Sequence, residues 1–394
     1  MRILARFSVA AIAGVLALCA SLPVAAQFHD TWLVSQHTCP GGSGTDALFQ
    51  DPDGRIWVGC GSAATGYGLS VSYDMGASWE PPQATPAGIL NEFRVSSISL
   101  GRDGHLKIAG FDATTKNMVL SLDISGTPAP GAVYAATPVL VGVAQVGRQF
   151  HVGTYREKHN RSMAEALTGA SVLHAPDGTG SSASDWTTMS PGGQMTDLVV
   201  HDNRFWATGS TISEPPTLFL PPENQNATAP MTPAVPVLPT SWSGELWGLA
   251  VNGQRLVATG VHQGPTRGKI LVSGPDPRDM NGYAEVDISA AVLGTPSVRT
   301  WGRGVCMRGD TVVVVGERRP LSSHTGLVLL SGNGGAGFSD ITPDDVDSTV
   351  SKCLFMADGS LLVAGSGGFV GVLPADAGIF ADGFEGPLIW RETP

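Results

Sequence analysis

Apolar residues along the chain alternate with small and polar residues in a pattern that recurs and ends each time in glycine. Its copies occupy residues 54–61, 104–110, 147–153, 203–209, 254–260, 310–316 and 359–365. Successive copies lie 44 to 56 residues apart, with a mean of about 51. Alternation with a period of two predicts strands with one buried face, and recurrence at a near-constant interval predicts a repeat architecture.

Each copy is predicted to be the second strand of a hairpin. An apolar stretch precedes every copy, and polar turns such as DPDG and GRDG join the two, which is a hairpin signature. The predicted first strands are 47–49, 97–100, 141–144, 198–200, 248–251, 304–307 and 353–356. A variable polar loop then leads to a third strand at 69–72, 119–122, 171–174, 217–220, 270–273, 327–330 or 369–373.

Seven units of three or four strands, with this period, predict an all-β chain folded as a seven-bladed β-propeller. A β-sandwich does not need seven equivalent hairpins. Kelch propellers share the period, but the Gly-Gly doublet that follows their second strand is missing here. The seventh unit stops after its third strand, near Leu373, and the alternating segment 31–36 precedes the first unit. We therefore expect 31–36 to pair with 369–373, which would close the ring and remove two sheet edges.

The first 26 residues are predicted to be a secretory signal. Arg2 and Arg6 precede an apolar stretch at 7–22, and small residues before Gln27 offer a cleavage site after Ala26. The stretch is short for a membrane anchor, which is the alternative, and no later segment of the sequence is long and apolar enough to cross a bilayer. We expect a secreted or periplasmic protein, with the propeller at 27–374 and a C-terminal tail at 375–394.

Charge and composition narrow the range of partners. The chain carries a net charge of −11, and loss of the two signal arginines makes it about −13. This sign argues against nonspecific binding to nucleic acid or to an anionic membrane surface. Only 14% of the residues are charged and 51 are glycine, a composition that favours short strands and tight turns over disorder.

Four cysteines remain after the signal: Cys39, Cys60, Cys306 and Cys353. An even number in an oxidising compartment predicts disulfides. Four cysteines allow three pairings, and proximity in the sequence favours Cys39–Cys60 and Cys306–Cys353. Four free thiols are the alternative.

The segment SYDMGASW, which begins at Ser72 and follows the third strand of the first unit, has the chemistry of a tight turn. Asp74 can accept backbone N–H bonds, Gly76 can take a positive φ, and Trp79 can bury its ring between neighbouring sheets. The spacing returns in SGNGGAGF of the sixth unit, at Ser331, Asn333, Gly335 and Phe338.

This S-x-D-x-G-x-x-W spacing is similar to the Asp-box, or BNR repeat, of sialidases and other secreted propellers. The resemblance implies a turn between third and fourth strands, on the face away from the active site, and so a structural role. Sialidases also use three arginines that clamp a carboxylate, a Tyr–Glu pair and an Asp acid. Their F/Y-R-I-P motif is absent, and Arg55 is the only arginine between Gln27 and Ser72. No catalytic residue is therefore assigned.

Charged and aromatic residues concentrate at one predicted end of the blades. The loops between second and third strands share this end with the entries to each first strand. The residues singled out are Arg94, Tyr155, Arg156, Glu157, His159, Arg161, His262, Arg267, Trp301, Arg303, Glu317 and Arg318. Arginines beside tryptophans suit anionic or sugar-like ligands, through forked hydrogen bonds and stacking. The alternative is a solvated loop face, with Trp247 and Trp301 packing between blades.

Other chemical signals are weak. The nine histidines show no zinc-type spacing, and no phosphate-binding loop or G-x-S-x-G elbow is present. We therefore predict neither a metal nor a cofactor. The tail segment IFADGFE (379–385) resembles a short C-terminal motif of various exported proteobacterial proteins.

The sequence leaves three functions open. The first is a monomeric binding module for a small-molecule, glycan-like or protein ligand. The second is a glycan-active hydrolase of sialidase-like fold with a rearranged site. The third is an assembly or stability factor for another exported complex.

Overall fold

The computed structural model describes residues 32–39, 44–60, 68–90, 94–111, 117–143, 150–154, 171–175, 187–189, 194–201, 204–210, 216–221, 232–238, 244–262, 266–319, 324–344 and 346–376. These residues are almost entirely strands and turns. The predicted signal at 1–26 and the IFADGFE segment lie outside them.

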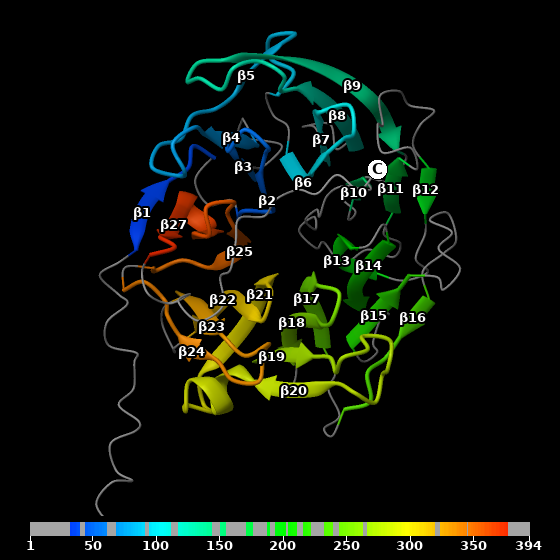
Figure 1. Ribbon diagram of the computed structural model, residues 1–394, viewed down its shortest axis with the longest axis vertical. Helices are drawn as coiled ribbons and strands as arrows, with labels where there is room; N and C mark the ends of the chain where they lie inside the picture. Colours follow the sequence, from blue (N-terminus) through cyan, green and yellow to red (C-terminus); the bar gives the residue numbers. More distant parts are fainter. Residues whose placement is uncertain are drawn as a thin grey trace, which may run out of the picture.

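The described strands form seven sheets arranged around a common axis (Figure 1). They are numbered one to seven in chain order. The first three contain β2 (Ala47–Gln50), β3 (Ile56–Gly59) and β4 (Leu69–Ser72); β6 (Arg94–Leu100), β7 (His105–Phe111), β8 (Asn117–Asp123), β9 (Val133–Val143) and β5 (Gln83–Thr85); and β10 (Phe150–Thr154), β11 (Ser171–Ala175) and β12 (Thr187–Met189).

Four further sheets complete the arrangement. Sheets four and five contain β13 (Gln194–His201), β14 (Arg204–Ser210), β15 (Pro216–Leu220) and β16 (Thr232–Ala234); and β17 (Gly244–Val251), β18 (Leu256–His262), β19 (Arg267–Val272) and β20 (Ala284–Asp287). Sheets six and seven contain β21 (Arg299–Arg308), β22 (Thr311–Arg319), β23 (Thr325–Ser331) and β24 (Ser339–Asp340); and β25 (Val350–Phe355), β26 (Leu361–Gly365), β27 (Phe369–Leu373) and β1 (Leu33–Gln36). Two short helical turns, η4 (Ile288–Val292) and η5 (Ser366–Gly368), follow β20 and β26.

The innermost strands contact one another in a closed series. Each of β2, β6, β10, β13, β17, β21 and β25 contacts the next, and β25 contacts β2. Apolar side chains fill the spaces between neighbouring sheets. Trp57 of sheet one, for example, packs in one cluster with Leu106 and Leu120 of sheet two.

The predicted closure is confirmed. β1 pairs antiparallel with β27, from Leu33 opposite Val372 to Gln36 opposite Phe369, and Figure 1 shows the two ends of the described chain side by side. Trp32, just before β1, is buried and its indole Nε1 donates to the carbonyl oxygen of Ile341 at 3.1 Å. The N-terminal strand therefore completes sheet seven, as the missing fourth strand required.

Both expected cysteine pairs are present, and each joins two sheets. Cys39 follows β1 and is bonded to Cys60, which follows β3, with a Cα–Cα distance of 6.2 Å. Cys306 of β21 is bonded to Cys353 of β25, with a Cα–Cα distance of 5.7 Å. Sheet seven, which closes the series, is thus tied covalently to sheet one on one side and sheet six on the other.

One strand assignment from the sequence is wrong. The segment 141–144 was expected to open the third unit, but β9 runs to Val143 and pairs with β8 as far as Asn117. β9 is long enough to cover β8, so this apolar stretch completes sheet two, and β10 is the innermost strand of sheet three. In addition, β5 leaves the first unit and pairs in parallel with β9, at Gln83 opposite Val133.

A bulge near the start of five innermost strands explains why the repeats of sheets five, six and seven end in glycine. The ladder to the second strand skips one residue in each: Ser96, Thr196, Trp247, Arg303 and Ser351. A Cβ on Gly316 would overlap the carbonyl oxygen of Trp301, and a Cβ on Gly365 would overlap that of Thr349. Glycine is required there because the bulged backbone occupies the space that a side chain would need.

The turns at Ser72–Trp79 and Ser331–Phe338 share one hydrogen-bond pattern. In each, the first serine hydroxyl accepts the glycine N–H four residues on, at 2.8 Å for Gly76 and 2.9 Å for Gly335. The same hydroxyl donates to Asp74 in one turn and to Asn333 in the other. Both glycines have φ near +90°. These side chains satisfy the turn itself, which is a structural role.

Candidate functional site

The bulges place five side chains at corresponding points of their strands, and two of these differ in kind from the rest. Ser96, Thr196 and Ser351 are short, and their hydroxyls donate to main-chain carbonyl oxygens at 2.7 to 3.1 Å. In sheets five and six the bulged residues are Trp247 and Arg303 instead. The equivalent positions of one chain thus carry a small structural hydroxyl three times and a large side chain twice, in adjacent sheets.

These two residues belong to a compact group, here called the Arg–Trp cluster: Trp247, Trp301, Arg303, Glu317 and Arg319. The Arg303 guanidinium lies over both indoles, 4.7 Å from the Trp247 centroid and 4.5 Å from that of Trp301. Arg319 lies 3.5 Å from the Trp301 centroid. Stacking of this kind is favourable by about 0.5 to 2 kcal/mol per contact, and it fixes the plane of each guanidinium.

Glu317 holds the cluster together. Its Oε1 accepts from Arg303 Nη2 at 2.7 Å and from Arg319 Nη2 at 3.1 Å. Its Oε2 accepts from the Thr349 hydroxyl of the next sheet at 2.7 Å and lies 3.3 Å from His324 Nδ1. Glu317 and Arg319 are two residues apart on β22, so both project to the same face of the sheet.

The environment of Glu317 keeps its carboxylate ionised. Burial alone would raise its pKa, but the charge of Arg303 and the hydrogen bonds from Thr349, Arg303 and His324 lower it to about 2. Burial lowers the pKa of Arg303, whereas Glu317 raises it. Arg319 lowers the pKa of Arg303 as well, and Glu245 raises it. Around the neutral range the cluster is therefore a charged, hydrogen-bonded unit.

Exposure increases outward through the cluster. The side chain of Glu317 is 1% exposed, those of Arg303 and Arg319 are 17% and 32% exposed, and that of His324 is 54% exposed. Arg319 therefore stacks on the Trp301 ring and bonds to the Glu317 carboxylate, while part of its guanidinium is exposed to solvent. A guanidinium that is both oriented and accessible can bind a carboxylate or similar planar oxygen ligand with little further loss of side-chain conformational entropy.

The other described residues singled out from the sequence do not join this cluster. Each arginine among them has a carboxylate of its own: Arg94 pairs with Asp46, Arg267 with Asp287 and Arg318 with Asp340, at 3.3, 3.8 and 2.9 Å. His262 ends β18, opposite Arg267 in the ladder. The structure therefore brings together Trp301, Arg303 and Glu317, and separates Arg318 from them because it projects to the opposite face of β22.

Five other candidates fall outside the described residues: Tyr155, Arg156, Glu157, His159 and Arg161. Arg319 stands in the same charged loop of the sixth unit as Glu317 and Arg318, but of these two arginines only Arg318 was singled out for the site. Alternation along β22 puts Glu317 and Arg319 on one face, and a buried glutamate is expected to face its partner.

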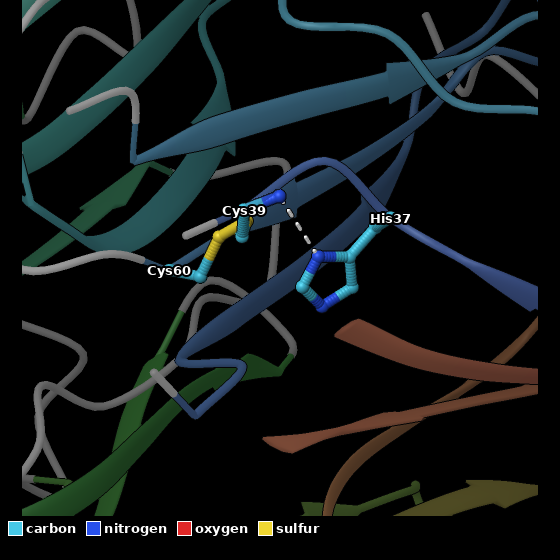
Figure 2. Close-up of side chains that lie close together, drawn as sticks. All are labelled: His37, Cys39 and Cys60. Carbon is cyan, nitrogen blue, oxygen red and sulfur yellow. Dashed lines mark hydrogen bonds between the residues drawn. A yellow bond between two sulfur atoms is a disulfide. The ribbon is translucent and has the colours of Figure 1, made fainter. Parts of the chain in front are cut away.

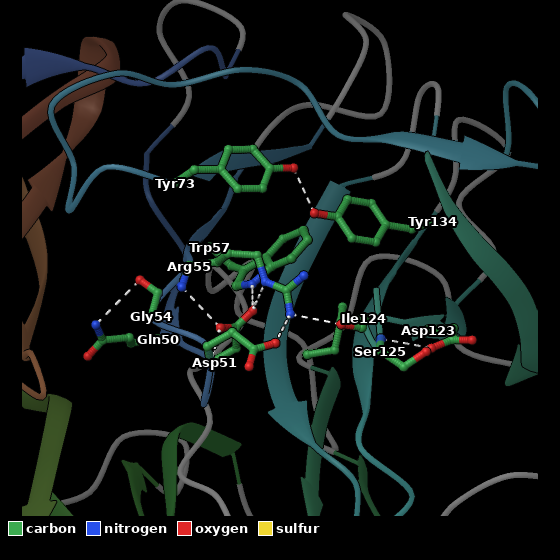
Figure 3. Close-up of polar contacts among 11 residues, drawn as sticks. Gln50, Asp51, Gly54, Arg55, Trp57, Tyr73, Asp123, Ile124, Ser125 and Tyr134 are labelled. Atoms are coloured by element: carbon green, nitrogen blue, oxygen red, sulfur yellow. Dashed lines mark hydrogen bonds and ion pairs between the residues drawn. The ribbon is translucent and has the colours of Figure 1, made fainter. Parts of the chain in front are cut away.

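A second polar network joins sheets one and two around the turn between β2 and β3, at the end of the blades away from the Arg–Trp cluster; Figure 3 shows its side chains. The buried Asp51 carboxylate accepts from the Arg55 guanidinium and from Trp57 Nε1 at 2.9 Å. Arg55 Nη2 also donates to the Ile124 carbonyl of sheet two at 2.8 Å. The hydroxyls of Tyr73 and Tyr134 lie 2.6 Å apart, across the same boundary. Arg55 is thus 1% exposed and joins two sheets, in keeping with its predicted place in a hairpin.

Among the described residues, one group offers three metal-binding atoms close together: His37, Cys39 and Cys60. The two sulfurs are bonded to each other, so this group is not a metal site in the oxidised form. No helix in the described part of the chain is long and apolar enough to cross a membrane.

Comparison with known proteins supports the fold. No protein-family model matches the sequence, and no curated protein matches it. Among solved structures the chain is similar to YCF48 bound to a D1 peptide, with a TM-score of 0.53 and 16% identity over 88% of this chain and 96% of that one. It is also similar to YCF48 from Cyanidioschyzon merolae (TM-score 0.51, 13% identity, 86% and 98% covered) and to Streptogramin B lyase (0.53, 12%, 88% and 98%). These are β-propeller proteins, and the likeness shows that the chain has a β-propeller fold.

Proposed function

We propose that this chain is an exported seven-bladed propeller, with one blade per sheet and Asp-box turns, that binds an acidic peptide segment of a partner protein. The binding face is the end of the blades that carries the Arg–Trp cluster. The exported location rests on the N-terminal signal pattern and is compatible with the two disulfides.

The proposal rests on one observation: the bulged residue is a large side chain in sheets five and six, Trp247 and Arg303, and a serine or threonine at the other three bulges. Every bulge solves the same structural problem, and a serine or threonine hydroxyl suffices for it at Ser96, Thr196 and Ser351. Trp247 and Arg303 are not needed for that purpose. Bulges commonly re-aim side chains beside functional sites, so the two large residues mark the specialised sector of the ring.

The chemistry of the cluster favours a carboxylate. Two guanidiniums share the single carboxylate of Glu317, which leaves one positive charge among the groups in direct contact. Arg319 is the more exposed of the two, and only its Nη2 atom bonds to Glu317. Its Nε atom is buried, so Nη1 and the second N–H of Nη2 are the pair with the geometry that arginine uses for carboxylates.

A peptide is favoured over a glycan because a propeller of similar fold, YCF48, is known with a D1 peptide bound to it. Hydrolysis has less support, because Tyr73 follows the end of β4 and pairs with Tyr134 of β9 at the boundary of sheets one and two, away from the Arg–Trp cluster. Tyr283 donates to the Pro277 carbonyl at 2.7 Å. None of these three described tyrosines reaches Glu317 as a sialidase-like nucleophile pair would require.

The test is a binding screen of the purified full chain against an array of extended peptides with a central Asp or Glu, with a glycan array that includes sialosides in parallel. We expect retention of acidic peptides and a loss of affinity of at least about tenfold in Arg319→Gln, which corresponds to one lost charge-assisted interaction. Arg102→Gln is the matched control, because it removes the same charge from an exposed turn at the opposite end of the blades.

Equal losses in both variants would reduce the effect to net charge and contradict the site. Retention of glycans with no retention of peptides would overturn the peptide assignment, and release of a cleaved glycan would overturn the binding role in favour of hydrolysis.

A further inference from the structure

Three side chains with metal-binding atoms converge where the end of β1 meets sheet one (Figure 2). The nitrogen of His37 and the sulfurs of Cys39 and Cys60 all lie within 4.8 Å of one another. The three residues are 5%, 7% and 0% exposed. A disulfide sulfur is a poor ligand, because the thiolate is the form that binds metals. The group therefore has two chemical states that depend on the disulfide.

The imidazole is already oriented for coordination. The Thr45 hydroxyl donates to the Gly365 carbonyl at 3.0 Å, so its oxygen is left to accept a hydrogen bond from His37 Nε2–H, 3.2 Å away. The lone pair of Nδ1 then faces the cysteines and accepts the backbone N–H of Cys39 at 3.2 Å (Figure 2). Metal-binding histidines are commonly fixed in this way, by a partner on the nitrogen that does not bind the metal.

We propose that reduction of Cys39–Cys60 converts this group into a Cys2His site for a thiophilic ion such as Zn2+. A dithiol reductant supplies two electrons and two protons, becomes a disulfide itself and leaves two cysteine thiols. The ion then binds both sulfurs and displaces two protons. His37 Nδ1 exchanges its bond to the Cys39 N–H for the third metal bond. Two thiolates and one imidazole form a ligand set that zinc uses, with a water molecule as the fourth ligand.

At this location a metal ion would link the closing strand to the neighbouring sheet. Cys39 lies just after the strand that closes the propeller, and Cys60 lies in sheet one, so their bond ties the closing strand to the neighbouring sheet. An ion between the same two sulfurs would keep that tie where the disulfide is reduced. The second disulfide offers a matched comparison, because among described residues no third ligand accompanies Cys306 and Cys353.

The test uses the full chain in both redox states. A phosphine reduces the disulfides, taking its oxygen from water to become the phosphine oxide, and is removed under nitrogen. Co2+ is then titrated while thiolate-to-cobalt charge-transfer absorption is recorded, and native mass spectrometry counts bound Zn2+ and displaced protons. We expect one ion per reduced chain with two protons lost, and none in the oxidised chain.

Variants distinguish a site that uses His37 from metal binding by the free thiols alone. Thr45→Val should weaken binding about 10- to 100-fold, since it removes the partner that orients His37, and His37→Gln should weaken it at least as much. The double variant Cys306→Ser/Cys353→Ser should bind as the wild type does. The proposal is overturned by equal affinity in His37→Gln and wild type, by undiminished binding in Cys39→Ser/Cys60→Ser, or by a reduced chain that unfolds with Zn2+ present and binds none.

Discussion

Replacement of Glu317 by glutamine tests the electrostatics of the Arg–Trp cluster most sharply. The carboxylate is 1% exposed and bonds to Arg303, Arg319 and Thr349. Its pKa falls from 4.5 to about 2, because the charge of Arg303 and the hydrogen bonds outweigh the opposing effect of burial. At 1.36 kcal/mol per pKa unit, the ionised form contributes about 3 kcal/mol to the free energy of unfolding at pH 7.

The sign of the pH dependence follows from the direction of the shift. A pKa lowered by folding gives a contribution that is complete above pH 4.5 and is lost as the pH falls towards 2. Glu317→Gln should therefore lower the free energy of unfolding by about 3 kcal/mol at pH 7 and by only about 1 kcal/mol at pH 3. Urea denaturation of wild type and variant at both pH values measures this difference.

The control is Glu80→Gln, a carboxylate that accepts the exposed Gly131 N–H at 2.6 Å. It should change the unfolding free energy far less. A loss below 1 kcal/mol for Glu317→Gln at pH 7, or a loss of the same size at pH 3 and pH 7, would show that the ionised carboxylate does not stabilise the fold through its partners.

Three further predictions concern the stability of the sheets that position the Arg–Trp cluster. Gly316→Ala should destabilise by about 2 to 3 kcal/mol in urea denaturation, since its Cβ would overlap the Trp301 carbonyl, whereas Gly126→Ala, with open space around it, should be nearly neutral. Removal of Cys306–Cys353 by a double serine variant should cost about 4 kcal/mol, from the chain entropy of a 47-residue separation; a loss below 1 kcal/mol would deny it a role in joining the sheets. Trp32→Ala should cost about 3 to 5 kcal/mol for a large buried ring and expose the closing strand to limited proteolysis; an unchanged cleavage rate would count against closure by β1.

Much of the fold could be predicted because the repeat is local. Alternation, turn residues and a fixed interval depend on neighbouring residues, and they predicted the second strands and the pairing of 31–36 with 369–373. A strand that joins the sheet of a different repeat unit could not be predicted in this way. Whether 141–143 opens one sheet or finishes another depends on the length of β8 beside it, and the parallel pairing of β5 with β9 is a long-range contact with no local signature.

The candidate site was predicted in part for the same reason. Composition and spacing predicted which end of the blades carries the charged and aromatic residues, and they singled out Trp301, Arg303 and Glu317 at that end. The bulges could not be predicted from the sequence, because a one-residue shift in a ladder depends on the partner strand. They are nonetheless what sets Trp247 and Arg303 apart from Ser96, Thr196 and Ser351. The charged loop of the sixth unit contains both Arg318 and Arg319, and only the alternation of faces along β22 tells which of them lies beside Glu317.

The most direct test of the proposed binding face is the footprint of a bound acidic peptide on the full chain, measured by amide hydrogen exchange. We expect slower exchange at Trp301–Arg303 and Glu317–Arg319 when the peptide is saturating. Slower exchange confined to the turns at Ser72–Trp79 and Ser331–Phe338, or no change anywhere at saturation, would contradict it.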